Sequence, residues 1–267
     1  MRRRDAGVPA PLLVPALLAV AFLVLPLVGL VVRAPWGDLG PQLSRPGVGD
    51  ALRLSLVSAT LATLVSLLLG VPLAWVLARS RVRGRSVLRA LVTVPLVLPP
   101  VVGGVALFLV LGRQGLVGEW LYETTGFALP FTTAAVVVAE TFVAMPFLVI
   151  SVEGALRAAD ARFEDAAATL GADRWTTFRR VTLPLVAPGI AAGAVLCWAR
   201  ALGEFGATIT FAGNFPGTTQ TMPLAVYLAL QRDPDAAIVL SLVLLAVSLA
   251  TLLLLRGRWL GQRGVAA

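Results

Sequence analysis

Three charged side chains stand inside otherwise apolar runs of this chain, and they are the first candidates for chemistry. Arg200 and Glu204 are four residues apart, a spacing that puts both on one face of a helix and lets them pair. Glu140 stands in a separate apolar run and is a further candidate partner for Arg200. If these runs cross a membrane, each charge costs about 2.5–3.5 kcal/mol to insert, so it faces water or the interior of a helix bundle.

Two interpretations of these residues stay open. The structural one is a salt bridge that only holds helices together. The functional one is that Arg200, Gly203, Glu204 and Glu140 line or gate a translocation path. An arginine would ease the passage of an anion, whereas permanent strong binding would trap it.

Most enzymatic chemistry is excluded by composition. The chain has no histidine, and Cys197 is its only cysteine, which we expect to be an inert packing residue. Disulfides within the chain, Cys/His metal sites and Ser–His or Cys–His nucleophile pairs are therefore ruled out. The phosphate loop G-x-x-x-x-G-K-[ST] is also absent from the sequence, so any ATP hydrolysis must come from another chain. We expect no catalytic residue, no metal site and no cofactor in this chain.

A second candidate site is the polar segment over residues 151–186. It is rich in alanine, unlike a passive linker, and apolar residues recur in it at helical spacing. Gly171 stands where a left-handed helix cap is expected, and Trp175 and Phe178 follow on a second short helix. The apolar face comprises Leu156, Ala159, Phe163, Ala167 and Leu170, and the polar face Arg157, Asp160, Glu164 and Asp165.

This segment could instead be an amphipathic helix on the lipid surface. Two features disfavour that alternative. Its polar face is acidic as well as basic, which suits an anionic leaflet poorly. The run Ala166, Ala167, Ala168 is small, which suits docking into a protein groove.

The elements that must position these residues are six membrane-spanning helices. Apolar residues make up 58% of the 267-residue chain and charged residues 13%, against roughly 25% charged in a soluble domain. A membrane helix needs about 20 apolar residues. Suitable runs cover residues 12–32, 54–78, 90–112, 129–150, 187–209 and 236–255. The fold class is therefore all-α, integral to a membrane.

Arginine placement predicts the orientation. All 22 basic residues are arginine, and 16 of them fall in the terminal segments and connections that lie on one side if the N-terminus is cytoplasmic. By the positive-inside rule, both termini are then cytoplasmic. A net charge of +8 in a soluble protein would suggest nucleic acid, but arginines clustered between apolar runs do not. Cleavage of the first run as a signal peptide is the alternative, although its apolar core is too long for one.

The segment around Gly171 carries a family resemblance. Asp165-Ala166-Ala167, then Gly171, then Val181-Thr182-Leu183-Pro184 resembles the EAA loop of ABC importer permeases, with matching spacing throughout. Asp165 stands where that family has Glu, and the neighbouring Glu164 could supply the longer carboxylate. In that family the loop docks into a separate cytoplasmic ATPase, which binds ATP and Mg²⁺. The resemblance implies a coupling role for Glu164, Asp165, Ala166, Ala167, Gly171, Ala172, Leu183 and Pro184.

Residues 199–208 and 212–227 resemble permeases for tetrahedral oxyanions, and among these the molybdate permease family is most similar. The resemblance implies a type I ABC importer permease fold with a first helix in 1–33, a permease domain over 51–255 and a tail over 256–267. It also implies a second copy of the chain, an ATPase dimer and an extracytoplasmic oxyanion-binding protein as partners, in the inner membrane of a prokaryote. Tungstate, sulfate and thiosulfate are alternative substrates, and an ATP-independent channel or scaffold is an alternative class.

Overall fold

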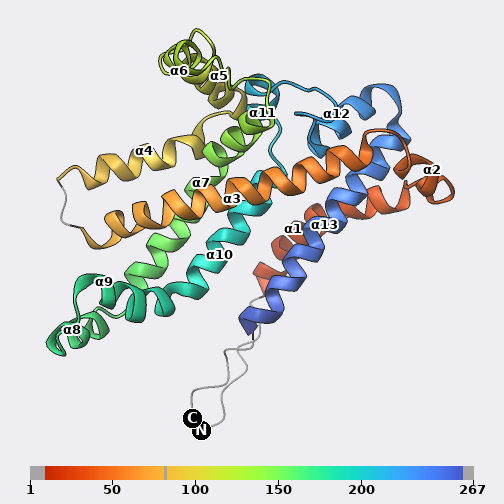
Figure 1. Ribbon diagram of the computed structural model, residues 1–267. Helices are drawn as coiled ribbons and strands as arrows, with labels where there is room; N and C mark the ends of the chain where they lie inside the picture. The colour runs from red at the N-terminus through yellow and green to blue at the C-terminus, as the bar shows by residue number, and fades with distance from the viewer. Residues whose placement is uncertain (1–9, 81–82, 261–267) are drawn as a thin grey trace.

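Every regular element in the described part of the chain is a helix (Figure 1). The computed structural model describes residues 10–80 and 83–260, but not the side chains of 10, 252 and 254–260. Arg2, Arg3, Arg4, Arg81 and Arg263 of the predicted orientation signal, and residues 261–267 of the predicted tail, lie outside this range. The longer helices are α1 (Ala10–Val32), α3 (Val48–Arg79), α7 (Thr133–Ala158), α10 (Leu183–Leu202) and α13 (Pro234–Leu260).

Helix α7 is the centre of the bundle and packs between α3 and α10 (Figure 1). Its buried face is built largely from small residues such as Ala139 and Ala144, with Leu148 and Val149 completing the core. Small residues let helix backbones approach closely, and close packing rather than a hydrophobic driving force holds helices together in lipid. The shorter helices are α2 (Leu39–Leu43), α4 (Arg85–Val97), α5 (Pro100–Leu111), α6 (Gly118–Thr125), α8 (Arg162–Thr169), α9 (Arg174–Thr177), α11 (Gly206–Phe211) and α12 (Met222–Arg232).

Five helices are long and apolar enough to cross a membrane, and the number rises to six if the bent pair α4 and α5 is one span. The run between Arg89 and Arg113, predicted as one span, consists of two helices with a bend of 116° between them. Leu98 and Pro99 adopt extended backbone angles between the two helices. A residue before proline avoids the helical region, and here two prolines follow in succession, so the helix ends at Val97 and restarts at Pro100.

The predicted span over residues 187–209 is also broken. Helix α10 ends at Leu202 and α11 begins at Gly206, which leaves Gly203, Glu204 and Phe205 outside regular structure. Glu204 stabilises the start of α11, since its side chain accepts a hydrogen bond from the Ala207 amide in the first turn of that helix.

The structure distributes residues 151–186 over several helices. Helix α7 continues to Ala158, so Leu156 is buried in the bundle core rather than on the surface of a loop helix. The α7–α10 loop, residues 159–182, then contains α8, α9 and a π-helical turn over Phe178–Thr182 that runs into α10. The predicted apolar face is therefore divided between two helices.

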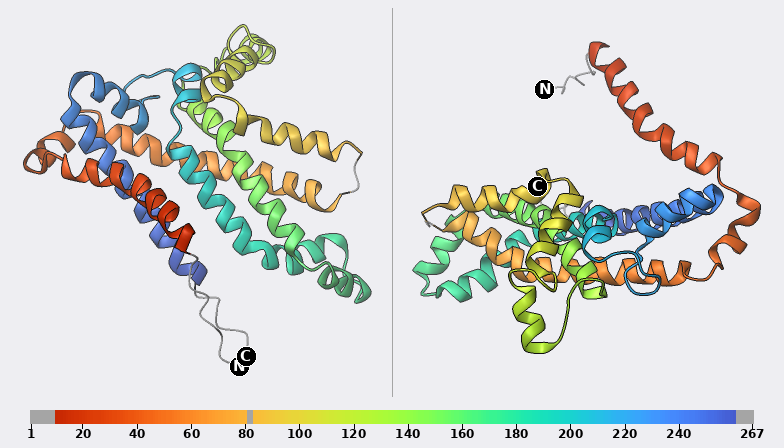
Figure 2. Two further views of the ribbon diagram at one scale, coloured as in Figure 1. Left: turned by 180° about the vertical axis from the view of Figure 1, so that it is seen from behind. Right: turned by 90° about the horizontal axis from the view of Figure 1, so that it is seen from above.

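The bundle has two distinct ends. Figure 1 places α8 and α9 at one of them, called the α8 end below, and α2, α6, α11 and α12 toward the other. Helix α1 contacts α13 but has no buried residue within its most apolar stretch, and the right-hand view of Figure 2 shows it standing away from the remaining helices. Its apolar side chains, such as Phe22 at 77% exposure, face neither core nor partner within the described chain.

Candidate functional site

Arg200 and Glu204 pair as the sequence predicted, although Glu204 lies beyond the end of α10. The Arg200 Nη2 and Glu204 Oε2 atoms are 2.5 Å apart. The Glu204 side chain is 1% exposed, and that of Arg200 is 28% exposed. The other carboxylate oxygen of Glu204 accepts a hydrogen bond from the Ala207 amide at 2.9 Å. The carboxylate therefore joins the last turn of α10 to the first turn of α11 across the break that contains Gly203.

Close packing of α5 against α11 holds this break in place. A Cβ atom added at Gly104 would lie 1.7 Å from the Thr210 hydroxyl and 2.8 Å from the Ala207 carbonyl oxygen. Only glycine leaves room for the two backbones to approach this closely. The α10–α11 break is thus fixed from outside by α5 as well as from inside by Glu204.

Glu140 lies buried on α7, with 1% exposure, but it does not pair with Arg200. Instead one of its carboxylate oxygens accepts a hydrogen bond from the Ser58 hydroxyl of α3 at 2.8 Å. One turn earlier on α3, the Ser55 hydroxyl accepts a hydrogen bond from the Met222 amide, the first residue of α12, at 2.7 Å. A polar ladder inside the bundle therefore connects α7 with α3 and α3 with α12. Pairing of Glu140 with Arg200 was predicted and is wrong for this conformation.

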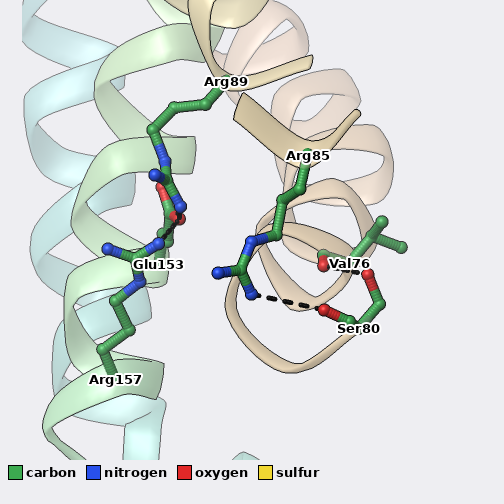
Figure 3. Close-up of polar contacts among 6 residues, drawn as sticks. All are labelled: Val76, Ser80, Arg85, Arg89, Glu153 and Arg157. Atoms are coloured by element: carbon green, nitrogen blue, oxygen red, sulfur yellow. Dashed lines mark hydrogen bonds and ion pairs between the residues drawn. The ribbon is translucent and has the colours of Figure 1, made fainter. Parts of the chain in front are cut away.

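Sequence reasoning missed a third buried carboxylate, Glu153, near the α8 end of α7 (Figure 3). Its Oε1 atom lies 2.6 Å from Arg89 Nη2 of α4 and 2.7 Å from Arg157 Nη2, one turn along α7. The Glu153–Arg157 spacing of four residues was a visible signal. The contact with Arg89 was not visible, because it depends on how α4 lies against α7. Among the described residues, no group of three or more His, Cys, Asp or Glu is arranged to hold a metal ion.

The two acidic residues of α8 differ in their contacts and exposure, although both line the groove between α8 and α3. Glu164 is turned inward, where its Oε1 atom lies 3.1 Å from Arg79 Nη2 and accepts a hydrogen bond from the Thr182 hydroxyl at 3.0 Å. Asp165 is exposed to solvent. Glu164 is already engaged in these contacts. It therefore does not take the place of the glutamate that the family has at position 165. Gly171 adopts a φ of 83°, the left-handed conformation predicted for it, and the amide of Ala172 reaches back to the Ala167 carbonyl as in a helix cap.

The α7–α10 loop exposes large apolar side chains at its outer surface. Phe163 is 57% exposed, Trp175 is 66% exposed and Leu170 is 88% exposed. Ala166 and Ala168 are exposed beside them, so the exposed surface of α8 carries small side chains that do not block a close approach by another protein. Leu183 and Pro184 start α10 and bring the chain back to the bundle. A short helix with small residues, a free carboxylate and exposed apolar side chains is suited to fit into a groove on another protein.

Comparison with known proteins places these features in a family. Residues 70–263 match the family described as binding-protein-dependent transport system inner membrane component. The chain is 52% identical over 234 residues to the molybdenum transport system permease protein ModB of Mycobacterium tuberculosis, covering 88% of each chain. It is 42% identical over 213 residues to ModB of Escherichia coli, covering 80% of this chain and 93% of the relative. It is 37% identical to the sulfate transport system permease protein CysT of Escherichia coli over 86% of this chain and 84% of the relative.

Solved structures show the same fold at low sequence identity. A bacterial ABC transporter that imports the acidic polysaccharide alginate matches with a TM-score of 0.75 at 19% identity, covering 95% of each chain. The MetNI methionine ABC transporter matches with a TM-score of 0.58 at 17% identity, covering 78% of this chain and 94% of the matched one. The helical arrangement is therefore that of ABC importer permeases.

Proposed function

The chain belongs to the family of binding-protein-dependent transport system inner membrane components, and from this premise we propose that it is the permease subunit of an ATP-driven molybdate importer. As a member of that family it is a multi-pass protein of the inner membrane. The 52% and 42% identity to two ModB proteins supports molybdate as the substrate. The lower identity of 37% to CysT makes sulfate the weaker alternative, with tungstate and thiosulfate as the further oxyanions to test.

The observation that carries the proposal is the α7–α10 loop. Helix α8 and its C-cap expose Asp165, small residues and the large side chains of Phe163 and Leu170 to solvent. We propose that this surface docks into a cytoplasmic ATPase dimer, which binds ATP and Mg²⁺ and supplies the energy that this chain cannot. In that arrangement the α8 end and both termini are cytoplasmic, as the arginine distribution predicts. An oxyanion-binding protein then meets the opposite face, near α2 and α12.

The translocation path is proposed to run between two copies of the chain. The apolar side chains of α1 are uncovered within the described chain and fit either lipid or a second copy. Arg200 is the partly exposed member of the Arg200–Glu204 pair, so it is the cation that an anion would meet. Glu204 would keep that cation from holding the anion permanently, since Arg200 stays neutralised.

A pair of glycine variants tests the coupling role. Gly171 and Gly126 both have positive φ, 83° and 72°, and a Cβ at either would have nothing within 4 Å. Valine strains the backbone equally at both, but only Gly171 borders the proposed ATPase contact. In liposomes with the ATPase and binding protein, we expect Gly171→Val to lose molybdate uptake and ATPase co-purification, and Gly126→Val to retain both.

The outcomes separate the possible functions. If both variants retain ATPase association and uptake, the loop is not the docking site, and an ATP-independent channel or scaffold becomes the better interpretation. If the unaltered complex takes up sulfate under ATP but not molybdate, the substrate assignment is wrong while the permease role stands. The inhibition of molybdate uptake by an equal concentration of tungstate then measures the selectivity of the complex between oxyanions of the same shape.

A further inference from the structure

One polar cluster connects α8 to the ends of three long helices. Arg79 is the last residue of α3, and its Nη2 atom donates a hydrogen bond to the carbonyl of Ala159, the C-cap of α7, at 3.3 Å. The same atom lies 3.1 Å from Glu164 Oε1 of α8. Glu164 Oε1 also accepts the Thr182 hydroxyl, at the residue directly before α10. One guanidinium nitrogen and one carboxylate oxygen thus tie α3, α7, α8 and the start of α10 together.

The cluster is shielded from solvent more than a surface ion pair is. The side chains of Arg79 and Glu164 are 21% and 22% exposed, and Thr182 is fully buried. By contrast, Arg162 pairs with Asp160 in the same α7–α10 loop with side chains 90% and 43% exposed. Water screens the Arg162–Asp160 pair strongly and the Arg79–Glu164 pair less. The Arg162–Asp160 pair also begins and ends within the loop, whereas Arg79–Glu164 joins the loop to the bundle.

An aromatic contact reinforces the same junction. The rings of Trp75 on α3 and Phe178, the residue after α9, meet edge to face with centroids 5.0 Å apart. Trp175 stacks on the other side of Phe178 at 5.6 Å. Beside these rings lies an open groove of about 790 Å³ that Glu164 and Pro72 also line. The loop is therefore held to α3 by one polar and one aromatic contact, and the groove beside them leaves it without a broad packed interface there.

We propose that Arg79, Glu164 and Thr182 make α8 move as one body with the adjoining ends of α3 and α10, and that Glu164 is a positioning residue rather than a contact to the ATPase. The proposal rests on the proposed function. When a partner displaces α8, the helices that surround the path move with it only if the loop does not deform. The groove beside the loop leaves space in which α8 could shift without moving α3. The charge-assisted contacts at Glu164 remove that freedom. Asp165, exposed on the neighbouring position, is left to meet the partner.

A brace that only stabilises the fold predicts a different result from a linkage that transmits motion. Loss of a brace lowers the melting temperature and the amount of folded protein, but each hydrolysed ATP still moves as much anion. Loss of a linkage leaves the ATPase bound and active while less anion moves for each ATP. The ratio of ATP hydrolysed to molybdate transported is therefore the decisive measurement.

The experiment uses the complete complex with its ATPase and binding protein in liposomes. We expect Glu164→Gln, Arg79→Gln and Thr182→Val to keep ATPase co-purification and to raise the ATP-to-molybdate ratio by about 2- to 30-fold, the range that mutations along coupling networks produce. Asp160→Asn is the matched control, because it removes a carboxylate from the same loop without touching the bundle, and its ratio should equal that of the unaltered complex. The charge-swapped double variant Arg79→Glu with Glu164→Arg should recover part of the lost coupling.

Three results would overturn the proposal. The linkage does not exist if Glu164→Gln and Asp160→Asn give the same ratio as the unaltered complex. Glu164 is a partner contact instead if Glu164→Gln loses ATPase co-purification as Asp165→Asn is expected to. Arg79 and Glu164 act independently of each other if the swapped variant is no better coupled than either single change. Failure of the proposed function is distinct from all three, since the unaltered complex would then show no ATP-driven uptake.

Discussion

The carboxylates at the α8 end of the bundle differ from Glu140 and Glu204, which lie farther from that end, in where their cationic partners come from. Glu153 and Glu164 each reach an arginine on a different helix, Arg89 of α4 and Arg79 of α3. Glu204 pairs with Arg200, four residues before it in its own segment. Glu140 has the Ser58 hydroxyl as its partner rather than a cation.

The difference assigns different tasks to the two groups. A pair within one segment shapes that segment, and Glu204 accordingly fixes the break between α10 and α11. A pair between helices resists their separation, so Glu153 and Glu164 hold the α8 end together. Burial differs in degree, because Glu140 and Glu204 are 1% exposed whereas the side chains of Glu153 and Glu164 are 8% and 22% exposed. Removing Glu204 should therefore cost more stability, and removing a carboxylate at the α8 end should change function at smaller cost.

The largest stability effect is expected for Glu204→Ala. The change leaves Arg200 without its counter-charge and the Ala207 amide without its acceptor, and breaking a buried pair from one side costs about 3–5 kcal/mol. Denaturant unfolding in detergent micelles measures the loss. The double variant Arg200→Met with Glu204→Ala removes the stranded charge and should recover much of it. If Glu204→Ala lost no more stability than the double variant, the uncompensated charge of Arg200 would not be the cause of the loss.

A smaller effect is expected for Glu153→Gln, about 1–2 kcal/mol, because the two arginines it releases are partly hydrated already. The same unfolding experiment applies. Arg89→Gln and Arg157→Gln distinguish the two contacts, since only Arg89 reaches Glu153 from another helix. If α4 is held by this pair, Arg89→Gln should also speed amide hydrogen exchange in α4, and Arg157→Gln should not.

For Glu164→Gln we expect a stability loss of at most about 1 kcal/mol, since the pair borders solvent and the amide can still accept from Thr182. Thermal unfolding of the purified chain checks this. The comparison between the two regions would fail if Glu164→Gln destabilised the chain as much as Glu204→Ala. A small stability change together with a changed ATP-to-molybdate ratio would support a functional rather than a stabilising role for Glu164.

The smallest effect concerns pH at the loop. Hydrogen bonds from the Thr176 hydroxyl and amide lower the pKa of Asp173, which caps α9. The capping contribution is therefore complete above the ordinary Asp pKa of about 3.9 and is lost as pH falls through the lowered value in the folded chain. Amide hydrogen exchange at Thr176, corrected for the intrinsic rate, should lose protection on acidification below that range. Asp173→Asn keeps an acceptor oxygen that does not titrate, so its protection should stay constant, and equal acid sensitivity in both would refute the assignment.

Much of the architecture was predictable from local patterns. Apolar runs of about 20 residues predict membrane helices because such a helix is long enough to cross the hydrocarbon core of the bilayer and apolar enough to lie in it. The left-handed backbone at Gly171 was predictable since glycine after an alanine-rich helix has a strong local preference for that conformation. The pairing of Arg200 with Glu204 followed from spacing alone. These features depend on residues close in sequence, so a single sequence contains the information.

The breaks and the contacts between helices were not predictable in the same way. A run of apolar residues with Pro99 and Pro100 inside it is compatible with a kink or with the 116° bend that the chain adopts. The contacts of Glu164 with Arg79 and of Glu153 with Arg89 join residues 85 and 64 positions apart in sequence, a separation that no periodicity reports.

By itself the sequence determined that this chain is a membrane protein, crosses the bilayer several times and carries one alanine-rich amphipathic loop, because these properties follow from composition and spacing. Tertiary structure alone decided which charges meet between helices. Glu164, predicted to support Asp165 at the outer surface, faces inward because the end of α3 places Arg79 within 3.1 Å of it. The solvation of a carboxylate depends on which helix lies beside it, and packing rather than local preference sets that neighbour.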